Sequence, residues 1–446
     1  MDRQRSPARL CRASERQDPG RPAWRPDKGT LHALGSGSCG GVEVRIALVS
    51  QNYPPLVNGQ ATFTRSLAAG LAERGHEVLV VCPAPGWREL RSRSGRLRLY
   101  RLAGIPLTCR PPRAAISVRP GPRLGQLFAA FAPELVHVQD HFPLCRSALG
   151  EARRRHLPTV ATNHFLPRNF TAYAPLPPPV RSVVESLLWA SVRDAFRTAD
   201  AVTVPTQAAA DLLRRQEVVP AALPISCGVD LARFRPSGRT ARPQLLAAQG
   251  LAAEACLALY LGRLDPEKRV DVLVTAMARV RDSRLHLLLA GRGLAEGRLH
   301  TLRRRLGLAS RVHFLGYVPD AALPALFDAA DLFVMPSEAE LQSLATLQAL
   351  AVGLPVIAAD AVALPELVRP GWNGALFRPG DADDLARWLD ALAGDPARRA
   401  AMAQASRATA AAHDQGLTVA RYEELYGALL SAARGSPEAR PTAPLG

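Results

Sequence analysis

The sequence predicts an α/β protein made of two doubly wound domains that face each other across a cleft. The first observation is length, because 446 residues are too many for one hydrophobic core and fit two large domains. The second is a repeated alternation of short apolar strands with helical segments, which is typical of a parallel sheet covered by helices on both faces. The third is a polar linker, residues 228–254, which separates two such alternations.

The first alternation predicts an N-terminal domain over residues 43–227, with helical stretches such as TRSLAAGLAERG between its strands. Its strands are predicted at residues 44–50, 77–83, 134–139, 159–165 and 201–206. The second alternation predicts a C-terminal domain over residues 255–415. Its strands are predicted near residues 256–263, 285–290, 312–315, 332–335 and 355–359. In such sheets ligands bind where the carboxyl ends of the strands open, which here is the cleft between the domains.

Three segments lie outside these two domains. Residues 1–42 are rich in Arg, Pro, Ser and Gly without periodicity, and we expect a disordered tail. Residues 416–433 are expected to form a helix that packs back on the N-terminal domain, and residues 434–446 a second tail. No apolar run reaches the ~18 residues of a membrane helix, and no apolar segment of a signal peptide is found.

The cysteines and the charges indicate the compartment and the partners. Seven cysteines without CxxC spacing predict a reduced cytoplasmic protein with no zinc site. The net charge is +17, of which residues 43–230 carry 23 basic and 13 acidic groups, or +10. This asymmetry suggests a polyanionic partner, although a GC-rich genome that fills surfaces with Arg would produce it too.

Two segments of the N-terminal domain predict contact with an anionic membrane surface. Residues 88–123 carry ten arginines against a lone Glu89, with Trp87 and other apolar residues interleaved. Residues 170–192 add an aromatic loop and an apolar helical face. The alternative is an Arg-coated solvent face over an ordinary core helix. No nucleic acid is expected, because few aromatic residues interleave the basic run. The protein is therefore expected in the cytoplasm or bound peripherally to the inner face of the membrane.

Several loops at strand ends suit an anionic ligand. In GRLDPEK the cations Arg263 and Lys268 follow a buried strand, and two cations there would bind a diphosphate. Lys268 is one of only two lysines among 56 basic residues. Gly291 in GRG and Gly59 in NG permit close backbone approach to an anion. Each of these features also has an interpretation without a ligand. The cations could be solvated loop charges, and the glycines could simply form tight turns.

Histidines also gather at strand ends. His137 and His141 lie in VHVQDHFP, and His164 lies in VATNHF. Histidines that face an interdomain cleft could contact the substrate, whereas a single buried histidine is usually structural. Zinc is not expected, because no Glu or Cys completes a ligand spacing.

The stretch PSEAELQSLATLQALAVGLPV, residues 336–356, combines three polar features. Glu340 lies in a loop, Ser343 opens a helix, and Gln348 lies four residues after Leu344 on the side expected to be buried. Gly353 and a following proline end the helix. A carboxylate, a helix N-terminus and an amide are thus brought to one place.

Together GRLDPEK, NGALFRPGD, CGVDLARFRP, HFLGYV and residues 336–356 resemble the retaining family 4 glycosyltransferases of the GT-B fold, which has two Rossmann-like domains. The resemblance spans about residues 44–430. QNYPPLVNGQATF and ATNHF look most like bacterial members that glycosylate membrane lipids or cell-envelope acceptors.

The resemblance implies roles for these residues. Arg263 and Lys268 match the diphosphate-binding pair, Gly59 the phosphate loop of the first domain, and His164 a histidine near the transferred sugar. Further matches lie in residues 336–356. There Glu340 matches a glutamate that contacts the sugar hydroxyls, and Ser343 and Leu344 match the helix start that faces the diphosphate. Gln348 stands where the family usually has a glutamate that binds the ribose. His137 and Gly291 are the remaining candidates for substrate contact.

The implied activity is retaining transfer of a hexose from a nucleotide-diphosphate sugar, of the UDP-glucose or GDP-mannose type, to a membrane lipid or cell-envelope acceptor. No metal or other cofactor is expected, because two fixed cations would take the place of Mg²⁺. The Asp381-x-Asp383 pair is expected to cap a helix. Gln348 leaves open a catalytically weak homologue that only binds a nucleotide sugar or a membrane. A sugar-nucleotide epimerase on the same fold is a third, less favoured reading.

Overall fold

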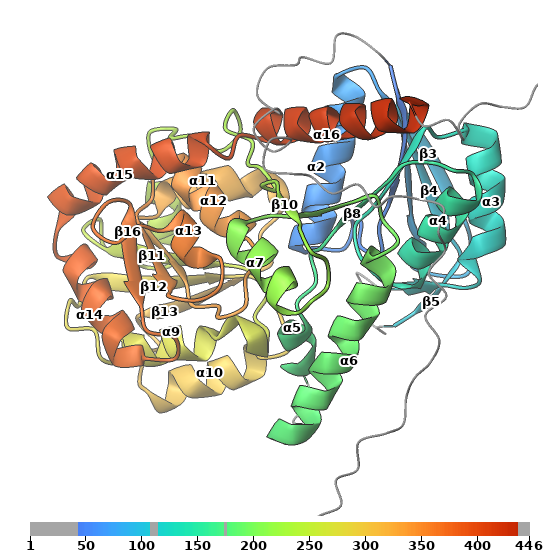
Figure 1. The fold of residues 1–446 in the computed structure, drawn as a ribbon. Coiled ribbons are helices and arrows are strands. Elements are labelled where there is room, and N and C mark those ends of the chain that lie inside the picture. Colours follow the sequence, from blue (N-terminus) through green and yellow to red (C-terminus); the bar gives the residue numbers. More distant parts are fainter. Residues whose placement is uncertain (1–42, 108–114, 174–175, 436–446) are drawn as a thin grey trace, which may run out of the picture.

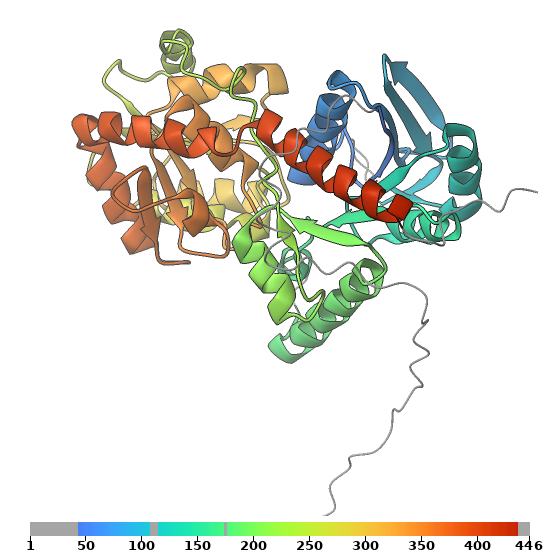
Figure 2. The same ribbon diagram turned by 45° about the horizontal axis from the view of Figure 1, so that its top comes forward.

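The computed structural model describes residues 43–107, 115–173 and 176–435 of the chain (Figure 1). Two sheets, each flanked by helices, form two domains that lie side by side (Figures 1 and 2). The predicted class, two doubly wound α/β domains, is confirmed. The segments at 108–114 and 174–175, together with both tails, lie outside the described residues.

The N-terminal sheet is centred on β1 (Arg45–Val49), whose last four residues are completely buried. Its strand order is β10-β9-β8-β7-β1-β2-β4-β3, and every neighbouring pair is parallel except β3 with β4. The other strands are β2 (Glu77–Pro83), β3 (Leu90–Ser94), β4 (Leu97–Leu102), β7 (Leu135–Val138), β8 (Thr159–Thr162), β9 (Ala201–Val204) and β10 (Leu223–Pro224). Such apolar strands read as continuous runs because helices cover both faces.

The Arg-rich segment after residue 88 is part of this sheet, which the sequence pattern did not reveal. It forms the hairpin β3–β4, and a second, two-stranded sheet follows as β5 (Gly104–Pro106) and β6 (Ala115–Ser117). Charged residues at the edge of a sheet discourage pairing with other chains, so the arginines suit an edge hairpin.

Helices cover both faces of the N-terminal sheet. One face carries α2 (Gly59–Glu73) and the C-terminal helix α16 (Gln415–Gly435). The other carries, among others, α3 (Pro120–Phe131), α4 (Pro143–Arg154), α6 (Pro178–Phe196) and α7 (Gln207–Arg215). The short helix α5 (Pro167–Thr171) lies between β8 and α6.

The C-terminal sheet is entirely parallel, in the order β13-β12-β11-β14-β15-β16. Its strands are β11 (Cys256–Leu261), β12 (Leu285–Ala290), β13 (Val312–Gly316), β14 (Leu332–Met335), β15 (Val356–Ala359) and β16 (Gly374–Phe377). Its helices are α9 (Val270–Met277), α10 (Glu296–Arg305), α11 (Leu323–Ala329), α12 (Leu344–Val352), α13 (Leu364–Leu367), α14 (Ala382–Ala393) and α15 (Pro396–Ala411), with short 3-10 turns at Pro266–Lys268 and Asp320–Ala322. One hydrophobic core joins these elements.

The chain crosses between the domains twice, and the two crossings are hydrogen-bonded to each other. Val229 N donates to His413 O at 2.8 Å, and Gln415 N donates to Val229 O at 3.0 Å. Gly228 has φ +77°, and a Cβ there would lie 2.7 Å from Thr418 Oγ1. Only glycine fits this position. The predicted linker, residues 228–254, is not wholly irregular, since it contains α8 (Arg242–Ala248), and Arg242 pairs with Asp331 of the C-terminal domain at 2.9 Å.

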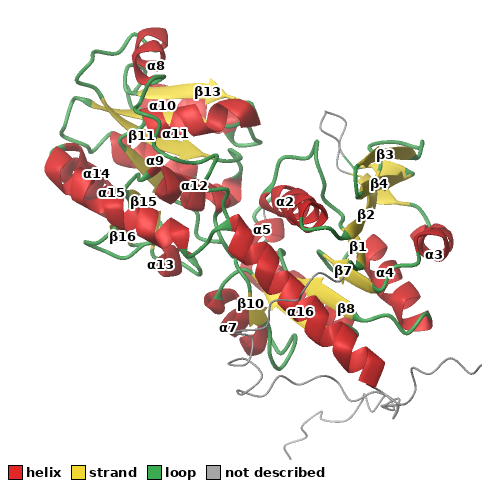
Figure 3. Ribbon diagram, turned by 90° about the horizontal axis from the view of Figure 1, so that it is seen from above, coloured by secondary structure: helices red, strands yellow, loops and turns green. Residues whose placement is uncertain are grey.

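After the second crossing α16 runs along the N-terminal domain (Figure 3). Its Tyr426 hydroxyl lies 2.7 Å from His137 Nδ1, and His137 Nε2 lies 2.6 Å from Thr162 Oγ1. His137 is completely buried, and this burial lowers its pKa to about 3. The expectation that His137 faces the cleft and contacts substrate is therefore wrong. It is a neutral core histidine that holds α16 on the sheet.

Within the described residues, no helix has both the length and the apolarity needed to cross a membrane. The four cysteines of that part, Cys82, Cys145, Cys227 and Cys256, are buried free thiols.

Burial of His137 predicts a pH-dependent stability. In the unfolded chain the imidazole takes up a proton near pH ~6.5, whereas in the folded protein it does so only near pH 3. Between these values the unfolded state binds more protons, so the free energy of unfolding falls as the pH falls. When the pH is lowered from 7 to 5, we expect the free energy of unfolding to fall less in a His137→Gln variant than in the wild type. The difference should be on the order of 2 kcal/mol.

Chemical denaturation at both pH values measures this difference. His156→Gln, on the surface, serves as the control and should behave as the wild type. An identical pH dependence in His137→Gln and wild type would show that His137 is not held neutral by the fold.

Candidate active site

The first turns of two helices meet where the domains face each other. Gly59 begins α2 in the N-terminal domain, and Leu344 begins α12 in the C-terminal domain. A Cβ at Gly59 would lie 4.0 Å from Leu344 Cδ1. Asn58 caps α2 by accepting from Ala61 N at 2.8 Å, and Ser343 caps α12 by accepting from Thr346 N at 3.2 Å. Because free N–H groups and partial positive charge lie at helix N-termini, this place suits an anion.

A buried ion pair lies just before α12. Lys268 Nζ is 2.7 Å from Glu340 Oε1, and both side chains are largely shielded from solvent. Lys268 ends the 3-10 turn after β11, and Glu340 lies in the loop after β14. These strands are neighbours in the parallel sheet, so their carboxyl ends bring the two groups together.

Arg263 lies in the same loop as Lys268 but has different partners. Its guanidinium donates to the carboxylates of Asp265 and Glu267, and its Nη1 lies 2.6 Å from the hydroxyl of Tyr173. These carboxylates help to raise the pKa of Arg263, although burial opposes them, so the group stays charged. Tyr173 belongs to the N-terminal domain, which makes this an interdomain contact. Sequence reasoning missed Tyr173 because nothing in its local pattern indicates a partner 90 residues away.

Gly291 allows two strand ends to approach closely. It has φ +139°, and a Cβ there would lie 1.9 Å from Gly262 O. Gly291 N also donates to Gly316 O at 2.7 Å. The glycine is thus required by the backbone packing at the carboxyl ends of β11, β12 and β13, independently of any ligand.

Gln348 lies on α12, one turn beyond Leu344, and is partly buried. The expectation that it lies on the buried side therefore holds only in part. Its amide makes no hydrogen bond to another residue in the part of the chain that the structure describes. It remains available to a ligand beside the helix N-terminus.

His164 lies in the N-terminal domain, in the loop after β8. Its Nε2 is 3.2 Å from Gln139 Oε1, and its ring lies 4.9 Å from that of Phe63 on α2. Desolvation lowers its pKa to about 3, so it is a neutral hydrogen-bonding group at physiological pH. His141 is separate from it, buried against the rings of Phe142 and Phe165.

A buried carboxylate that sequence reasoning missed organises this edge of the N-terminal sheet. Asp140 accepts hydrogen bonds from Gln51 N at 2.8 Å, Gln60 Nε2 at 2.8 Å and Phe142 N at 2.9 Å. Burial raises its pKa. Asp140 thereby joins the loop after β1, the first turn of α2 and the end of β7. Its place directly after a buried strand was the available signal.

The helix α5 ties the N-terminal domain to the loop that carries Glu340. Arg168 Nη2 lies 3.1 Å from Glu338 Oε2, and Asn169 Nδ2 donates to Ala339 O at 3.1 Å. Glu338 also pairs with Arg269. Sequence reasoning missed these contacts, because each joins segments about 170 residues apart.

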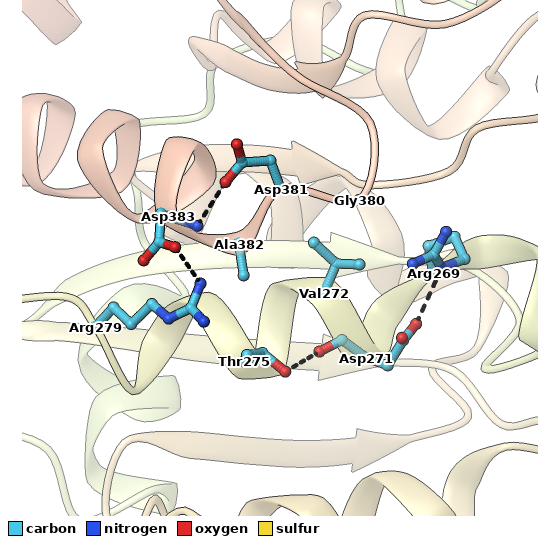
Figure 4. Close-up of a pocket in the computed structure, with 9 residues that line it drawn as sticks. All are labelled: Arg269, Asp271, Val272, Thr275, Arg279, Gly380, Asp381, Ala382 and Asp383. Carbon is cyan, nitrogen blue, oxygen red and sulfur yellow. Dashed lines mark hydrogen bonds and ion pairs between the residues drawn. The ribbon is translucent and has the colours of Figure 1, made fainter.

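A hollow beside this site lies between α9 and the first turn of α14 (Figure 4). It shares Arg269 with the site and is closed at one end by an ion pair between Arg279 and Asp383 at 3.0 Å. Asp381 accepts from the backbone N–H groups of Asp383 and Asp384, so it caps α14 as predicted. Within residues 43–107, 115–173 and 176–435, no cluster of three His, Cys, Asp or Glu side chains could hold a metal ion.

Two family models match the chain, one for each domain. Residues 57–233 match "Glycosyltransferase Family 4", and residues 242–409 match "Glycosyl transferases group 1". Among curated relatives, a GDP-mannose-dependent alpha-mannosyltransferase of Mycobacterium tuberculosis is 30% identical over 78% of this chain and 87% of its own. A D-inositol 3-phosphate glycosyltransferase of Salinispora tropica is 31% identical over 89% of this chain and 83% of its own. An alpha-monoglucosyldiacylglycerol synthase of Streptococcus pneumoniae is 26% identical over 79% of each.

Solved structures share the fold. Sucrose-phosphate synthase from Thermosynechococcus elongatus superposes with a TM-score of 0.71 and 25% identity, over 87% of this chain and 100% of that one. Anabaena Alr3699/HepE, solved in complex with UDP-glucose, superposes with a TM-score of 0.68 and 20% identity over the same shares. The family models, the relatives and the two facing domains agree. The chain belongs to glycosyltransferase family 4 and is a glycosyltransferase of the GT-B fold.

Proposed function

We propose that the protein is a retaining glycosyltransferase that moves a hexose from a nucleotide-diphosphate sugar to a membrane lipid or cell-envelope acceptor. The observation that carries the proposal is the meeting of the α2 and α12 N-termini beside Lys268. Two helix dipoles and a shielded ammonium group converge there from both domains. A diphosphate is the part of the donor that such a site would bind.

The chemistry is stabilisation of a leaving group. When the bond between the anomeric carbon and the phosphate oxygen breaks, negative charge grows on the departing diphosphate. Lys268, Arg263 and the N–H groups at the start of α12 are fixed before the reaction, and fixed donors stabilise developing charge effectively. These groups supply the positive charge that Mg²⁺ would otherwise provide, so the proposed reaction needs no metal.

The proposal assigns the acceptor proton to the departing phosphate. In the proposed retaining reaction the acceptor hydroxyl attacks from the face that the diphosphate leaves, and its proton passes to a phosphate oxygen. His164, held neutral by desolvation, would donate or accept a hydrogen bond on the transferred sugar. Glu340, adjacent to Lys268, would accept from sugar hydroxyls.

The names of the relatives support both the proposed donor and the proposed acceptor. The name of the mycobacterial relative includes GDP-mannose, and that of the streptococcal relative includes a glucosylated diacylglycerol. We therefore favour a donor of the GDP-mannose or UDP-glucose type and a lipid acceptor. The alternative suggested by Gln348 is a catalytically weak homologue that binds a nucleotide sugar or a membrane without turnover. A sugar-nucleotide epimerase is not favoured, because the relatives named above are transferases or a synthase.

Binding of a panel of UDP-, GDP- and ADP-sugars tests the proposed function. A cognate donor should raise the melting temperature, because a ligand that binds only the folded state stabilises it. Slow hydrolysis of that donor without acceptor should follow if the protein is an enzyme. Lys268→Ala should reduce turnover a few hundredfold, since removing a fixed donor at a developing charge costs about 3–4 kcal/mol.

The control is Arg298→Ala, which removes an exposed cation from α10 and should leave turnover unchanged. If Lys268→Ala kept more than half of the wild-type kcat, Lys268 would not belong to the site. If donors bound but were never hydrolysed or transferred, the weak homologue would be the better description.

Gln348→Glu should tighten binding of the nucleoside diphosphate. A carboxylate beside the N-terminal half of α12 would accept a charge-assisted hydrogen bond from ribose in place of a neutral one. We expect a gain of about 1 kcal/mol, or roughly fivefold in affinity, measured by calorimetry. Gln348→Ala is the matched variant without a ribose acceptor and should bind more weakly than wild type. Weaker binding by Gln348→Glu would place the ribose elsewhere.

The structure changes the expected membrane contact. Glu89 is not the lone acid near the Arg-rich segment, because Arg96 and Arg98 lie 2.5 and 3.1 Å from Glu43 and Glu77. Glu89 itself lies 2.8 Å from Arg123 and 4.0 Å from Arg91, so four of the eight arginines that the structure describes in this segment are paired. The hairpin β3–β4 therefore presents less free positive charge than its sequence suggests.

The second predicted segment retains an exposed apolar face. Val183 and Leu187 of α6 are 60% and 66% exposed, and Phe170 of α5 is 59% exposed. The spacing of the two α6 residues places them on one side of the helix, which projects from the body of the protein (Figures 1 and 2). We propose this face as the contact with an anionic membrane, assisted by the net charge of the domain, and hence a peripheral location.

Co-sedimentation with vesicles tests this contact. We expect binding that increases with the fraction of anionic lipid and is strongly reduced by a Leu187→Glu, Val183→Glu double change. Leu417→Glu, at an exposed apolar residue of α16, is the matched control and should bind as the wild type. Binding that ignores both lipid charge and the α6 changes would refute this surface.

A further inference from the structure

We propose that Tyr173 is an interdomain latch that ties the two domains together across the cleft and competes with the donor diphosphate for Arg263. The inference rests on the proposed function, since it assumes that a nucleotide-diphosphate sugar binds at Arg263 and Lys268. It adds a regulatory contact that the chemistry of transfer does not require.

The latch is a hydrogen-bonded cluster with partners from both domains. Tyr173 follows α5 in the N-terminal domain, and its hydroxyl lies 2.6 Å from Arg263 Nη1 in the C-terminal domain. The same hydroxyl lies 2.9 Å from Asp265 Oδ2 and 2.9 Å from Glu267 Oε1. Its environment raises the pKa of Tyr173, mainly through desolvation, so the phenol is neutral.

The partners of Arg263 differ in how readily they can be replaced. Asp265 and Glu267 are buried and belong to the same loop as Arg263, so they hold its guanidinium whether the domains are open or closed. Tyr173 alone among these partners comes from the other domain. A guanidinium has five N–H donors, and a charged phosphate oxygen accepts from them more strongly than a neutral phenol does. The diphosphate would therefore displace Tyr173 and leave the two carboxylates in place.

The cluster is not fully satisfied in this arrangement. The phenol has one proton and can donate it to Asp265 or to Glu267, but not to both at once. Glu267 Oε2 is buried and makes no hydrogen bond within the described part of the chain. A contact of this kind is weak enough to be broken by a ligand.

A second contact on the same segment strengthens the latch. Arg168 reaches Glu338 in the loop that also carries Glu340, so residues 168–173 contact both loops of the donor site. While these contacts are made, only part of the population is ready to bind donor. The apparent dissociation constant is then raised by the inverse of that fraction. Weakening the latch should therefore increase donor affinity.

The test is calorimetric titration of UDP, GDP and ADP into the full-length protein and its variants. Tyr173→Phe should bind the cognate diphosphate about three- to tenfold more tightly than wild type, and Tyr173→Ala at least as tightly as Tyr173→Phe. Arg168→Gln should shift affinity in the same direction. Tyr100→Phe, on β4, is the matched control and should bind as the wild type. Loss of structure cannot produce tighter binding, so the expected result cannot arise from misfolding.

The outcomes separate the latch from the proposed function. If the wild type binds and the Tyr173 variants bind equally or more weakly, the latch is refuted and the donor site stands. If only the Tyr173 variants bind, the latch is supported in its strongest form. If neither the wild type nor any variant binds UDP, GDP or ADP, the donor site itself is refuted, and the latch with it.

Discussion

The arrangement of the site depends on the close approach of two helix N-termini from different domains. A Cβ at Gly59 would lie at ordinary van der Waals distance from Leu344, 4.0 Å from its Cδ1, and Asn58 and Ser343 satisfy part of each first turn. The remaining N–H groups create positive potential that neither domain would have alone. This constraint explains why the site needs two domains in a fixed relation, and why the double crossing at Val229 and Asp414 matters.

The cations of the cleft are compensated by carboxylates of the protein itself. Lys268 is paired with Glu340, and Arg263 with Asp265 and Glu267. Buried charges require such partners, since an unpaired ion in a poorly hydrated site is costly. A donor bound as proposed would have to replace these contacts, so its affinity would report the free-energy difference between its own contacts with the cations and the contacts that the carboxylates make. Arg168 and Tyr173 make contacts across the cleft, so this free-energy difference would also depend on the relative position of the two domains.

The two polar edges of the cleft are built differently. On the C-terminal side charged groups predominate, which suits a diphosphate. On the N-terminal side His164 is held uncharged, Asp140 is used to join backbone loops, and the positive charge of Arg168 is paired with Glu338. This side is therefore better suited to hydroxyl groups than to an anion. The exposed apolar face of α6 lies in the same domain, which is consistent with an acceptor that is presented at a lipid surface.

Local pattern was sufficient for the fold class, the main strands and the presence of Lys268 and Glu340 in loops at the strand ends. Long apolar runs between helical segments specify a buried parallel sheet wherever they occur, and Lys268 and Glu340 follow such runs directly, so their neighbourhood could be inferred. Asp381 could be recognised as a helix cap because capping depends on residues two or three positions away. The edge hairpin β3–β4 could not be recognised, because its exposed, Arg-rich strands lack the apolar pattern of a buried strand.

The tertiary structure decided the direction and the partners of each side chain. His137 and His164 both follow or lie in apolar strands, yet one contacts α16 in the core and the other contacts Gln139 and Phe63. The surroundings of His137 depend on the packing of α16, a helix almost 300 residues later in the chain. The residues next to His137 in the sequence do not indicate this contact. The same holds for Tyr173 and Arg168, whose partners are in the other domain. The sequence alone thus determined which groups stand at the strand ends. Only the folded chain determined which of them meet, because contacts between distant segments are set by how the two domains pack.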